Sequence, residues 1–214
     1  MSQIKLVVFD MDGTIIEPRS SWAMIHDYFG TDNTEMLQMY IDHKISDKEF
    51  VKADIKLWNS KSDVPVNEEY INSILDKAKP RKGAEELITS LHEANIKTII
   101  LSGGIQYLAD KWAKEWNMDE ALANDLIDDK NGELTAIIKS SGHNKGPVME
   151  KMIEKYNFNK NEIAAVGDTV VDIPTFERAG LSIAVNTEDE RVISKANYHL
   201  KGDLTELKSL ILNW

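Results

Sequence analysis

Residues 7–16 read VVFDMDGTII, and this stretch decides the fold. The apolar run that leads to Asp10 is typical of a parallel strand that is buried on both faces, and a second acid, Asp12, follows two residues later. Two carboxylates this close repel each other unless a cation or a proton offsets their charge. A buried strand that ends in such a pair therefore predicts a functional site at its carboxyl end.

Further apolar runs have the composition of strands, and they cover residues 96–101, 162–167, 181–185 and 196–200. Segments with helical periodicity lie between and after them, at residues 83–94, 105–116, 145–156, 172–179, 188–195 and 203–212. This alternation predicts an α/β fold with a Rossmann-like parallel sheet. The pair Asn131-Gly132 interrupts the alternation and predicts a β-hairpin, which would add an antiparallel strand to the sheet.

Residues 20–79 show no alternation of strands and helices. They contain four amphipathic segments, which we expect to be helices over residues 20–30, 32–44, 46–58 and 67–79. The expected N-caps and helix stops are Ser21, Asp32, Ser46, Asn67, Gly30 and Pro80. We therefore expect two domains, an α/β core of residues 1–18 and 80–214 and a helical cap of residues 19–79, which we call the helical insert.

The composition excludes several classes of function. Of the 214 residues, 36 are acids and 25 are Lys or Arg, so the formal net charge of −11 argues against binding to nucleic acid or to an anionic membrane. There is no cysteine, which excludes disulfides and thiolate metal sites and favours a cytoplasmic location. The first ten residues resemble no signal peptide and are too short to span a membrane.

Polar residues follow three of the expected strands, where the carboxyl ends of a parallel sheet form a crevice. Residues 102–104 read SGG after the second strand, residues 167–169 read GDT after a later one, and residues 145–146 read KG at the start of the preceding helix. If these strands are neighbours, their side chains converge with those of the first strand. The side chains that we expect to meet there are Asp10, Asp12, Thr14, Ser102, Lys145, Asp168 and Asp172.

Four acids in one crevice require a cation, and an all-oxygen set of ligands suits Mg2+. The hydroxyls of Ser102 and Thr14, the ammonium of Lys145 and the backbone N–H groups of the glycine-rich loops are donors for a phosphate group. The two acids of the first strand then have separate tasks. One attacks phosphorus and becomes an aspartyl-phosphate, while the other gives a proton to the leaving alcohol and later takes one from water.

Four segments carry a resemblance to a known family. DMDGT at 10–14, LSGG at 101–104, NKG at 144–146 and VGDTVVD at 166–172 resemble the four motifs of the haloacid dehalogenase superfamily of phosphohydrolases, in the same order. The resemblance covers essentially the whole chain. The helical insert is similar to the C1 cap of the phosphoserine phosphatase branch, which also has a hairpin at the corresponding place.

The resemblance implies roles for the acidic residues. It makes Asp10 the nucleophile and Asp12 the general acid and base. It implies that Asp10, the backbone carbonyl of Asp12 and Asp168 hold Mg2+, while Asp172 supports the metal's water ligands and orients Lys145. The same resemblance assigns the binding of the phosphoryl group to Ser102, to Lys145 and to the N–H of Gly103.

The residues that would recognise the rest of the substrate depart from that branch. In phosphoserine phosphatases an acid after the first motif pairs with the substrate ammonium, and an Arg of the cap pairs with its carboxylate. The corresponding places here hold Arg19 and Asp54, with Lys52 and Lys56 nearby. This predicts a substrate other than phosphoserine. Arg19 either grips an anionic part of the substrate or is an exposed loop residue, and the sequence leaves both open.

Three more residues of possible function lie near these motifs. Trp22 and His26 are four residues apart and share one face of a helix, so they line the mouth of the site or pack inside the helical insert. Their burial preferences favour packing. His143 is expected to be a turn residue, because Asp12 already fills the acid–base role.

Three functions compete at this stage. The leading hypothesis is a Mg2+-dependent phosphomonoesterase that acts on a small phosphorylated metabolite, as a monomer or a homodimer with no nucleic-acid or membrane partner. A phosphotransferase or mutase would use the same residues but exclude water. A non-catalytic module that binds Mg2+ and phosphate, like a response-regulator receiver, is the third, and Asp12 argues against it because receivers lack this second acid.

Overall fold

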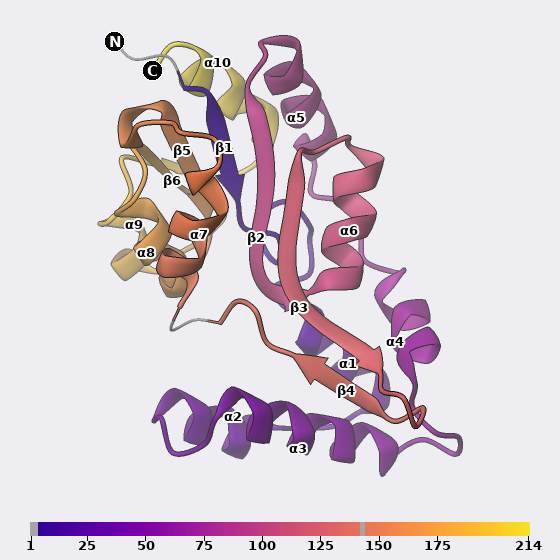
Figure 1. Cartoon of the computed structure of the whole chain (residues 1–214). Helices are drawn as coiled ribbons and strands as arrows, with labels where there is room; N and C mark the ends of the chain where they lie inside the picture. The colour runs from indigo at the N-terminus through magenta and orange to yellow at the C-terminus, as the bar shows by residue number, and fades with distance from the viewer. Residues whose placement is uncertain (1–3, 142–143) are drawn as a thin grey trace.

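The computed structural model describes residues 4–141 and 144–214, and its strands form one seven-stranded sheet in the order β4-β3-β2-β1-β5-β6-β7 (Figure 1). All neighbouring strands are parallel except β3 and β4, which are antiparallel. The strands are β1 Leu6–Phe9, β2 Lys97–Ile105, β3 Glu120–Asp128, β4 Leu134–Ile137, β5 Ile163–Gly167, β6 Leu181–Val185 and β7 Tyr198–Leu200.

Helices cover both faces of this sheet, as the expected α/β fold requires. The helices outside the helical insert are α5 Ala84–Glu93, α6 Gln106–Glu115, α7 Lys145–Glu154, α8 Ile173–Phe176, α9 Glu190–Ile193 and α10 Leu207–Leu212. Short 3-10 turns are η1 Lys160–Glu162, η2 Val170–Asp172 and η3 Leu204–Glu206. Val7 and Phe9 of β1 belong to the core under α5, α6 and α10, whereas Leu6 and Val8 belong to the core under α7, α8 and α9. This alternation explains why the first strand is apolar throughout.

Strand β1 lies at the centre of the sheet, between β2 and β5. Phe9 pairs with Ile100 on one side and with Val166 on the other, so the three strands that end in the polar segments are neighbours, which is the condition for their side chains to converge. From β1 the chain builds β2 and β3 on one side, and it later returns to build β5 and β6 on the other. Such a reversal opens a crevice at the carboxyl end of the central strand.

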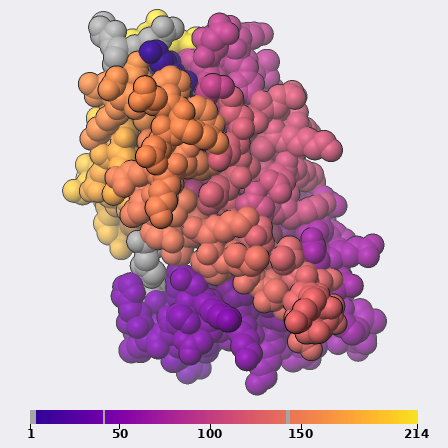
Figure 2. Space-filling view, in the orientation of Figure 1, coloured from indigo at the N-terminus to yellow at the C-terminus, as the bar shows by residue number. Residues whose placement is uncertain are grey.

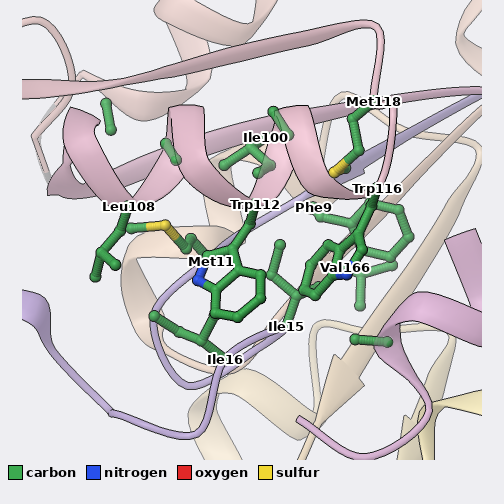
Figure 3. Close-up of a cluster of buried hydrophobic side chains, with 14 of the residues drawn as sticks. Phe9, Met11, Ile15, Ile16, Ile100, Leu108, Trp112, Trp116, Met118 and Val166 are labelled. Carbon is green, nitrogen blue, oxygen red and sulfur yellow. The ribbon is translucent and has the colours of Figure 1, made fainter. Parts of the chain in front are cut away.

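The loop that follows β1 is held by apolar side chains. Met11, Ile15 and Ile16 are fully buried, and they pack beside Trp112 of α6 and Trp116, which follows the end of that helix (Figure 3). The two indole rings stack with their centroids 4.8 Å apart. This core anchors the loop from below, which fixes the backbone that carries the two acids.

Four helices follow that loop, and they form the helical insert. They are α1 Ser21–Phe29, α2 Thr34–Ile41, α3 Asp47–Asn59 and α4 Glu68–Leu75. The insert lies beyond the carboxyl end of β1, at the lower end of the molecule in Figures 1 and 2, where its indigo and purple residues gather. Helix α1 contacts β2, α3 contacts β4 and α4 contacts β3, so the insert rests on the sheet edge and on the hairpin.

The two linkers that join the insert to the sheet run side by side. The N–H of Glu17 donates to the carbonyl of Lys79 at 2.9 Å, and the N–H of Arg81 donates to the carbonyl of Ile15 at 2.8 Å. The chain therefore leaves the α/β unit and returns to it at one place.

Three of the six predicted helix ends are confirmed, and the other three are wrong by one to five residues. Ser46 caps α3 in a capping box with Glu49, Asn67 caps α4, and Gly30 ends α1 in the left-handed conformation. The prediction that Ser21 is an N-cap was wrong, because Ser20 caps α1 and accepts from the N–H of Ala23. The N-cap of α2 is Asn33 instead of Asp32, although Asp32 Oδ1 still accepts from the N–H of Thr34. Helix α4 ends at Leu75, five residues before Pro80.

The secondary structure also differs from the prediction elsewhere: the helix expected over 188–195 covers only Glu190–Ile193, and the one expected over 203–212 is the turn η3 followed by α10. Strand β2 continues through SGG to Ile105, and the lack of a side chain at Gly104 lets its extended backbone pass close to Asp12, Ser21 and Met11. The helix expected over 172–179 is the turn η2 followed by the four-residue α8, with Pro174 near its start. The hairpin is confirmed, with Gly132 at a φ of 78° between β3 and β4. Within the described residues, every helix is too short or too polar to span a bilayer.

Candidate active site

A buried lysine joins two acids at the centre of the crevice. Lys145 is the first residue of α7, and its Nζ lies 2.6 Å from Asp10 Oδ1 and 2.5 Å from Asp172 Oδ1. Lys145 is 2% exposed. Burial alone lowers the pKa of this lysine, but the two carboxylates raise the pKa by more, so the ammonium stays charged.

Asp172 also fixes the loop that carries Asp168. Its Oδ2 accepts from the N–H of Asp168 and from the N–H of Thr169, both at 3.0 Å. Asp168 Oδ1 in turn accepts from the hydroxyl of Thr14 at 3.1 Å. Burial, followed by the neighbouring Asp172, raises the pKa of Asp168 to about 7. The loops after β1 and β5 are thus tied together through their side chains.

The acids in this crevice fit a divalent cation. Asp10, Asp168 and Asp172 each offer a carboxylate oxygen, and these atoms all lie within 4.8 Å of one another. Burial raises the pKa of Asp10 well above its usual value; Lys145 opposes this shift, and Asp172 and Asp168 add to it. One ammonium cannot offset three buried carboxylates. A hard cation with oxygen ligands, such as Mg2+, would supply the missing charge.

Gly13 lets two of the motifs come together. Its φ is 76°, and a Cβ at this position would lie 2.2 Å from Asp168 Oδ2. Any side chain here would push Asp168 away from the loop after β1, and a positive φ strains every residue other than glycine. The geometry of the site therefore requires a glycine at position 13 of the DMDGT segment.

Asp12 has quite different partners. Its Oδ2 accepts from both the N–H and the hydroxyl of Ser21, each at 2.7 Å. Its Oδ1 is buried and has no hydrogen-bond partner among the described residues. Burial raises the pKa of Asp12, and the two bonds from Ser21 oppose that shift. The second acid is thus held by neutral donors, whereas Asp10 is held by a cation.

The SGG segment of β2 lies against Asp12. A Cβ on Gly104 would lie 2.6 Å from Asp12 Oδ2, so the backbone passes directly beside this carboxyl group. Ser102 is buried, and its hydroxyl accepts from the N–H of Gly104 at 3.1 Å. The carbonyl of Gly103 accepts from the indole of Trp22 at 3.1 Å. The structure therefore places Gly104 directly beside Asp12, with Ser102 and Gly103 immediately before it in β2.

The helical insert contains its own buried polar group. Asp54 is fully buried, and its Oδ1 lies 3.3 Å from His26 Nε2 and accepts from the side chain of Asn33 at 3.0 Å. The indole of Trp58 donates to His26 Nδ1 at 3.2 Å. The prediction that His26 packs inside the insert is confirmed. Trp22 stacks on Trp58 inside the insert, with ring centroids 6.3 Å apart, and its indole also donates to the carbonyl of Gly103 in β2. Trp22 therefore packs inside the insert and also contacts the strand next to the acids.

Other predicted residues lie apart from the acids. Arg19 is exposed, in the linker that leads into α1. Lys52 and Lys56 line a groove of about 630 Å3 between α3 and the β3–β4 hairpin, and none of the acids of the crevice lines it. His143 lies outside the described residues.

Several residues of the site were missed by the sequence analysis. The guanidinium of Arg81 donates to the carbonyls of Gly13 at 2.6 Å and of Thr14 at 3.1 Å. Asn124 donates to the carbonyl of Gly103 at 2.8 Å. The contact of Ser21 with Asp12 was missed as well. Arg81 and Asn124 belong to none of the four motifs, and Ser21 was assigned a different role.

A family model, related sequences and solved structures all indicate the same family for this chain. A family model described as haloacid dehalogenase-like hydrolase matches residues 4–180. Phosphoserine phosphatase from Archaeoglobus fulgidus is 31% identical over 189 residues, which are 86% of this chain and 53% of that protein. Phosphoserine phosphatase from Methanocaldococcus jannaschii is 27% identical over 184 residues, 84% of each chain. A solved phospho-aspartyl intermediate analogue of phosphoserine phosphatase has a TM-score of 0.79 at 26% identity, covering 98% of this chain and 100% of that one.

These matches agree with the geometry of the site. The chain spans about half the length of the Archaeoglobus relative and most of the Methanocaldococcus one. The family model covers all four motif segments and the whole insert. The chain therefore belongs to the haloacid dehalogenase-like hydrolase family.

Proposed function

We propose that this protein is a Mg2+-dependent phosphomonoesterase that hydrolyses a small phosphorylated metabolite through an aspartyl-phosphate on Asp10. The observation that carries the proposal is the buried arrangement of Asp10, Lys145 and Asp172 beside Asp168. The relatives named phosphoserine phosphatase and the similar phospho-aspartyl structure support the same chemistry.

In the proposed reaction a carboxylate oxygen of Asp10 attacks phosphorus, and the bond from phosphorus to the substrate oxygen breaks. Asp12 gives its proton to that oxygen, so the product leaves as a neutral alcohol. Water then attacks the phosphorus of the aspartyl-phosphate and loses a proton to Asp12, which frees Asp10 and inorganic phosphate. The protonation states of both acids are thereby restored.

The remaining residues would bind the cation and the phosphoryl group. Asp10, the backbone carbonyl of Asp12 and Asp168 would hold Mg2+, with Asp172 beside them. When bound, the cation supplies positive charge that lets an anionic phosphate approach the acids. Lys145 joins Asp10 to Asp172, and this pairing supports a role in holding the nucleophile in place.

The donors for the phosphoryl oxygens would be the hydroxyl of Ser102, the N–H of Gly103 and the ammonium of Lys145. The hydroxyl of Thr14 already donates to Asp168, so its proposed contribution to phosphate binding is indirect, through the orientation of that acid. Residues 1–18 and 80–214 would form the catalytic core domain, and residues 19–79 a cap domain over the crevice.

The decisive experiment is the exchange of the nucleophile. Asp10→Asn should lower turnover at least about a thousandfold, because an amide is a poor nucleophile and a weaker ligand for Mg2+. Asp110→Asn, an exposed acid of α6, is the matched control and should retain full activity. A phosphoryl adduct on Asp10, detected by mass spectrometry after acid quench of the wild type, would complete the test. Retention of more than a tenth of the activity in Asp10→Asn would exclude the mechanism.

We further propose that phosphoserine is a poor substrate. Arg19 would repel an ammonium group. The substrate carboxylate would find no Arg of the insert at the corresponding place, because Asp54 stands there and is buried against His26 and Asn33. The relatives named phosphoserine phosphatase set a contrary expectation. The measurement is kcat/KM for phosphoserine against phosphoglycolate, glycerol phosphate and sugar phosphates at one Mg2+ concentration. Arg19→Glu should weaken turnover of the anionic substrates and spare phosphoserine. A preference of the wild type for phosphoserine by about tenfold or more would overturn this part.

A further inference from the structure

Ser21 makes two hydrogen bonds to one and the same oxygen. Its N–H and its hydroxyl both lie 2.7 Å from Asp12 Oδ2, and Ser21 itself is fully buried. The other oxygen, Asp12 Oδ1, is buried and has no partner in the part of the chain that the structure describes. The two oxygens of this carboxyl group are therefore in different environments.

The hydroxyl of Ser21 is itself held in place. It accepts from the N–H of Ile105 at 3.1 Å, so its own hydrogen is left to point at Asp12. Gly104 closes the same space, because a Cβ there would lie 2.7 Å from Ser21 Oγ and 2.6 Å from Asp12 Oδ2. A chain of hydrogen bonds thus runs from the end of β2 through Ser21 to the carboxyl group of Asp12.

We propose that Ser21 is a positioning residue that decides which oxygen of Asp12 carries the proton to the leaving group. The inference rests on the function proposed above. Two donors on Oδ2 leave no room for a proton there, since a protonated oxygen would face two further hydrogens. Oδ1 is then the oxygen that gives the proton and takes it back.

The same contact makes this arrangement depend on the helical insert. Ser21 is the first residue of α1, whereas Asp12 and Ile105 belong to the loop after β1 and to the end of β2. A displacement of α1 would break both bonds to Asp12 at once and free its carboxyl group to rotate. Asp12 is therefore oriented for proton transfer only while the insert is docked against the sheet.

The test is the first turnover of Ser21→Ala with two kinds of substrate. An alkyl phosphate needs a proton on its leaving oxygen, while p-nitrophenyl phosphate leaves as a stable phenolate and needs it less. We expect the rate of the first step to fall about tenfold for the alkyl substrate and less than about twofold for the aryl substrate, with little change in KM. This loss is expected because a small misplacement of the Asp12 carboxyl group lowers the rate of proton transfer strongly.

Three variants separate positioning from a general loss of structure. Ser20→Ala removes the neighbouring N-cap of α1, so it should lower the unfolding temperature without changing the ratio of alkyl to aryl rates. Ser21→Thr keeps the hydroxyl and should restore most of the alkyl rate. In an Asp12→Asn background, Ser21→Ala should have no further effect on the first step, because the proton donor is already absent.

The results also separate this inference from the proposed function. If Asp10→Asn is inactive and the wild type forms a phosphoryl adduct, but Ser21→Ala slows both substrates equally or neither, only the role of Ser21 is overturned. An additive loss in the Asp12→Asn background would overturn it too. If the wild type forms no adduct on Asp10, the proposed function itself fails.

Discussion

Asp10 and Asp12 are two residues apart, yet they meet opposite kinds of partner. Asp10 pairs with the ammonium of Lys145, whereas Asp12 accepts from the neutral donors of Ser21. Met11 between them is fully buried in the core below, which keeps the short segment from turning over. Burial raises the pKa of both acids, but only Asp10 has a cation in direct contact that opposes the shift. The difference in partners, an ammonium for Asp10 and neutral donors for Asp12, supports the proposed roles of Asp10 as the attacking carboxylate and of Asp12 as the proton carrier.

The proposed role of Asp12 predicts a selective defect in Asp12→Asn. The first turnover should slow by about a hundredfold or more for an alkyl phosphate and by much less for p-nitrophenyl phosphate, because the phenolate leaves without a proton. Rapid-quench measurement of the released alcohol is the readout, since later turnovers also need Asp12 as a base. Equal slowing of both substrates in that single turnover would remove the proton-donor role.

At the scale of elements, the two linkers of the helical insert are joined by one side chain. Arg81 follows the second linker, and its guanidinium binds the carbonyls of Gly13 and Thr14 in the first. Because Thr14 also donates to Asp168, this clamp extends from the linkers to the proposed metal site. A contact outside the four motifs thus holds the loop that carries the first of them.

Arg81→Gln should therefore lower the free energy of unfolding by about 1–3 kcal/mol, because the carbonyls lose hydrogen bonds from a charged donor. The shift of the urea midpoint, multiplied by the slope of the unfolding free energy against urea concentration, gives this value. Mg2+ affinity should fall as well, since Thr14 and Asp168 lose their support. Lys82→Gln is the matched control, because Lys82 is exposed and pairs with Asp203 at the surface. Comparable losses in both variants would contradict the clamp.

How far the elements could be predicted follows from the range of the contacts involved. The apolar run before Asp10 and the polar ends of the three central strands are local patterns, and the sheet and the cluster of acids could be predicted from them. Arg81 and Gly13 are 68 residues apart, and no local sequence pattern predicts the hydrogen bond between them. The local pattern predicts Ser21 as an N-cap, because serine is among the residues preferred at that position. The shift by one residue to Ser20 frees Ser21 to bind Asp12.

At the scale of the whole molecule, the buried acids couple stability to pH. The pKa of Asp168 is about 7 in the folded chain against an ordinary value of 3.8. The folded state therefore binds more protons than the unfolded state between about pH 4 and pH 7, so stability falls as the pH rises through this window. Asp10 is shifted in the same direction. A bound cation would offset the charge that causes the loss.

For the protein treated with EDTA, the unfolding temperature should therefore fall between pH 5 and pH 8. Mg2+ should raise it, and the gain should be larger at pH 8, where the acids are ionised. EDTA should also abolish turnover, and Mg2+ should restore it. Asp168→Asn should weaken both the pH dependence and the gain from Mg2+. If the addition of Mg2+ did not change the unfolding temperature at pH 8, this would argue against a metal at this site.

The paired linkers have a consequence for how such a protein can evolve. The chain leaves the sheet and returns to it at adjacent points, which are joined by the hydrogen bonds between Glu17 and Lys79 and between Ile15 and Arg81. For the rest of the fold, the insert is therefore equivalent to one closed loop. The free energy of closing a loop changes only slowly with its length, by about 0.6 kcal/mol for each doubling. Helices can be added, lost or exchanged between these two points while the chemistry of the sheet edge is kept, provided that the segment with Ser21 still reaches Asp12. New substrate preferences can then arise by changes within the insert.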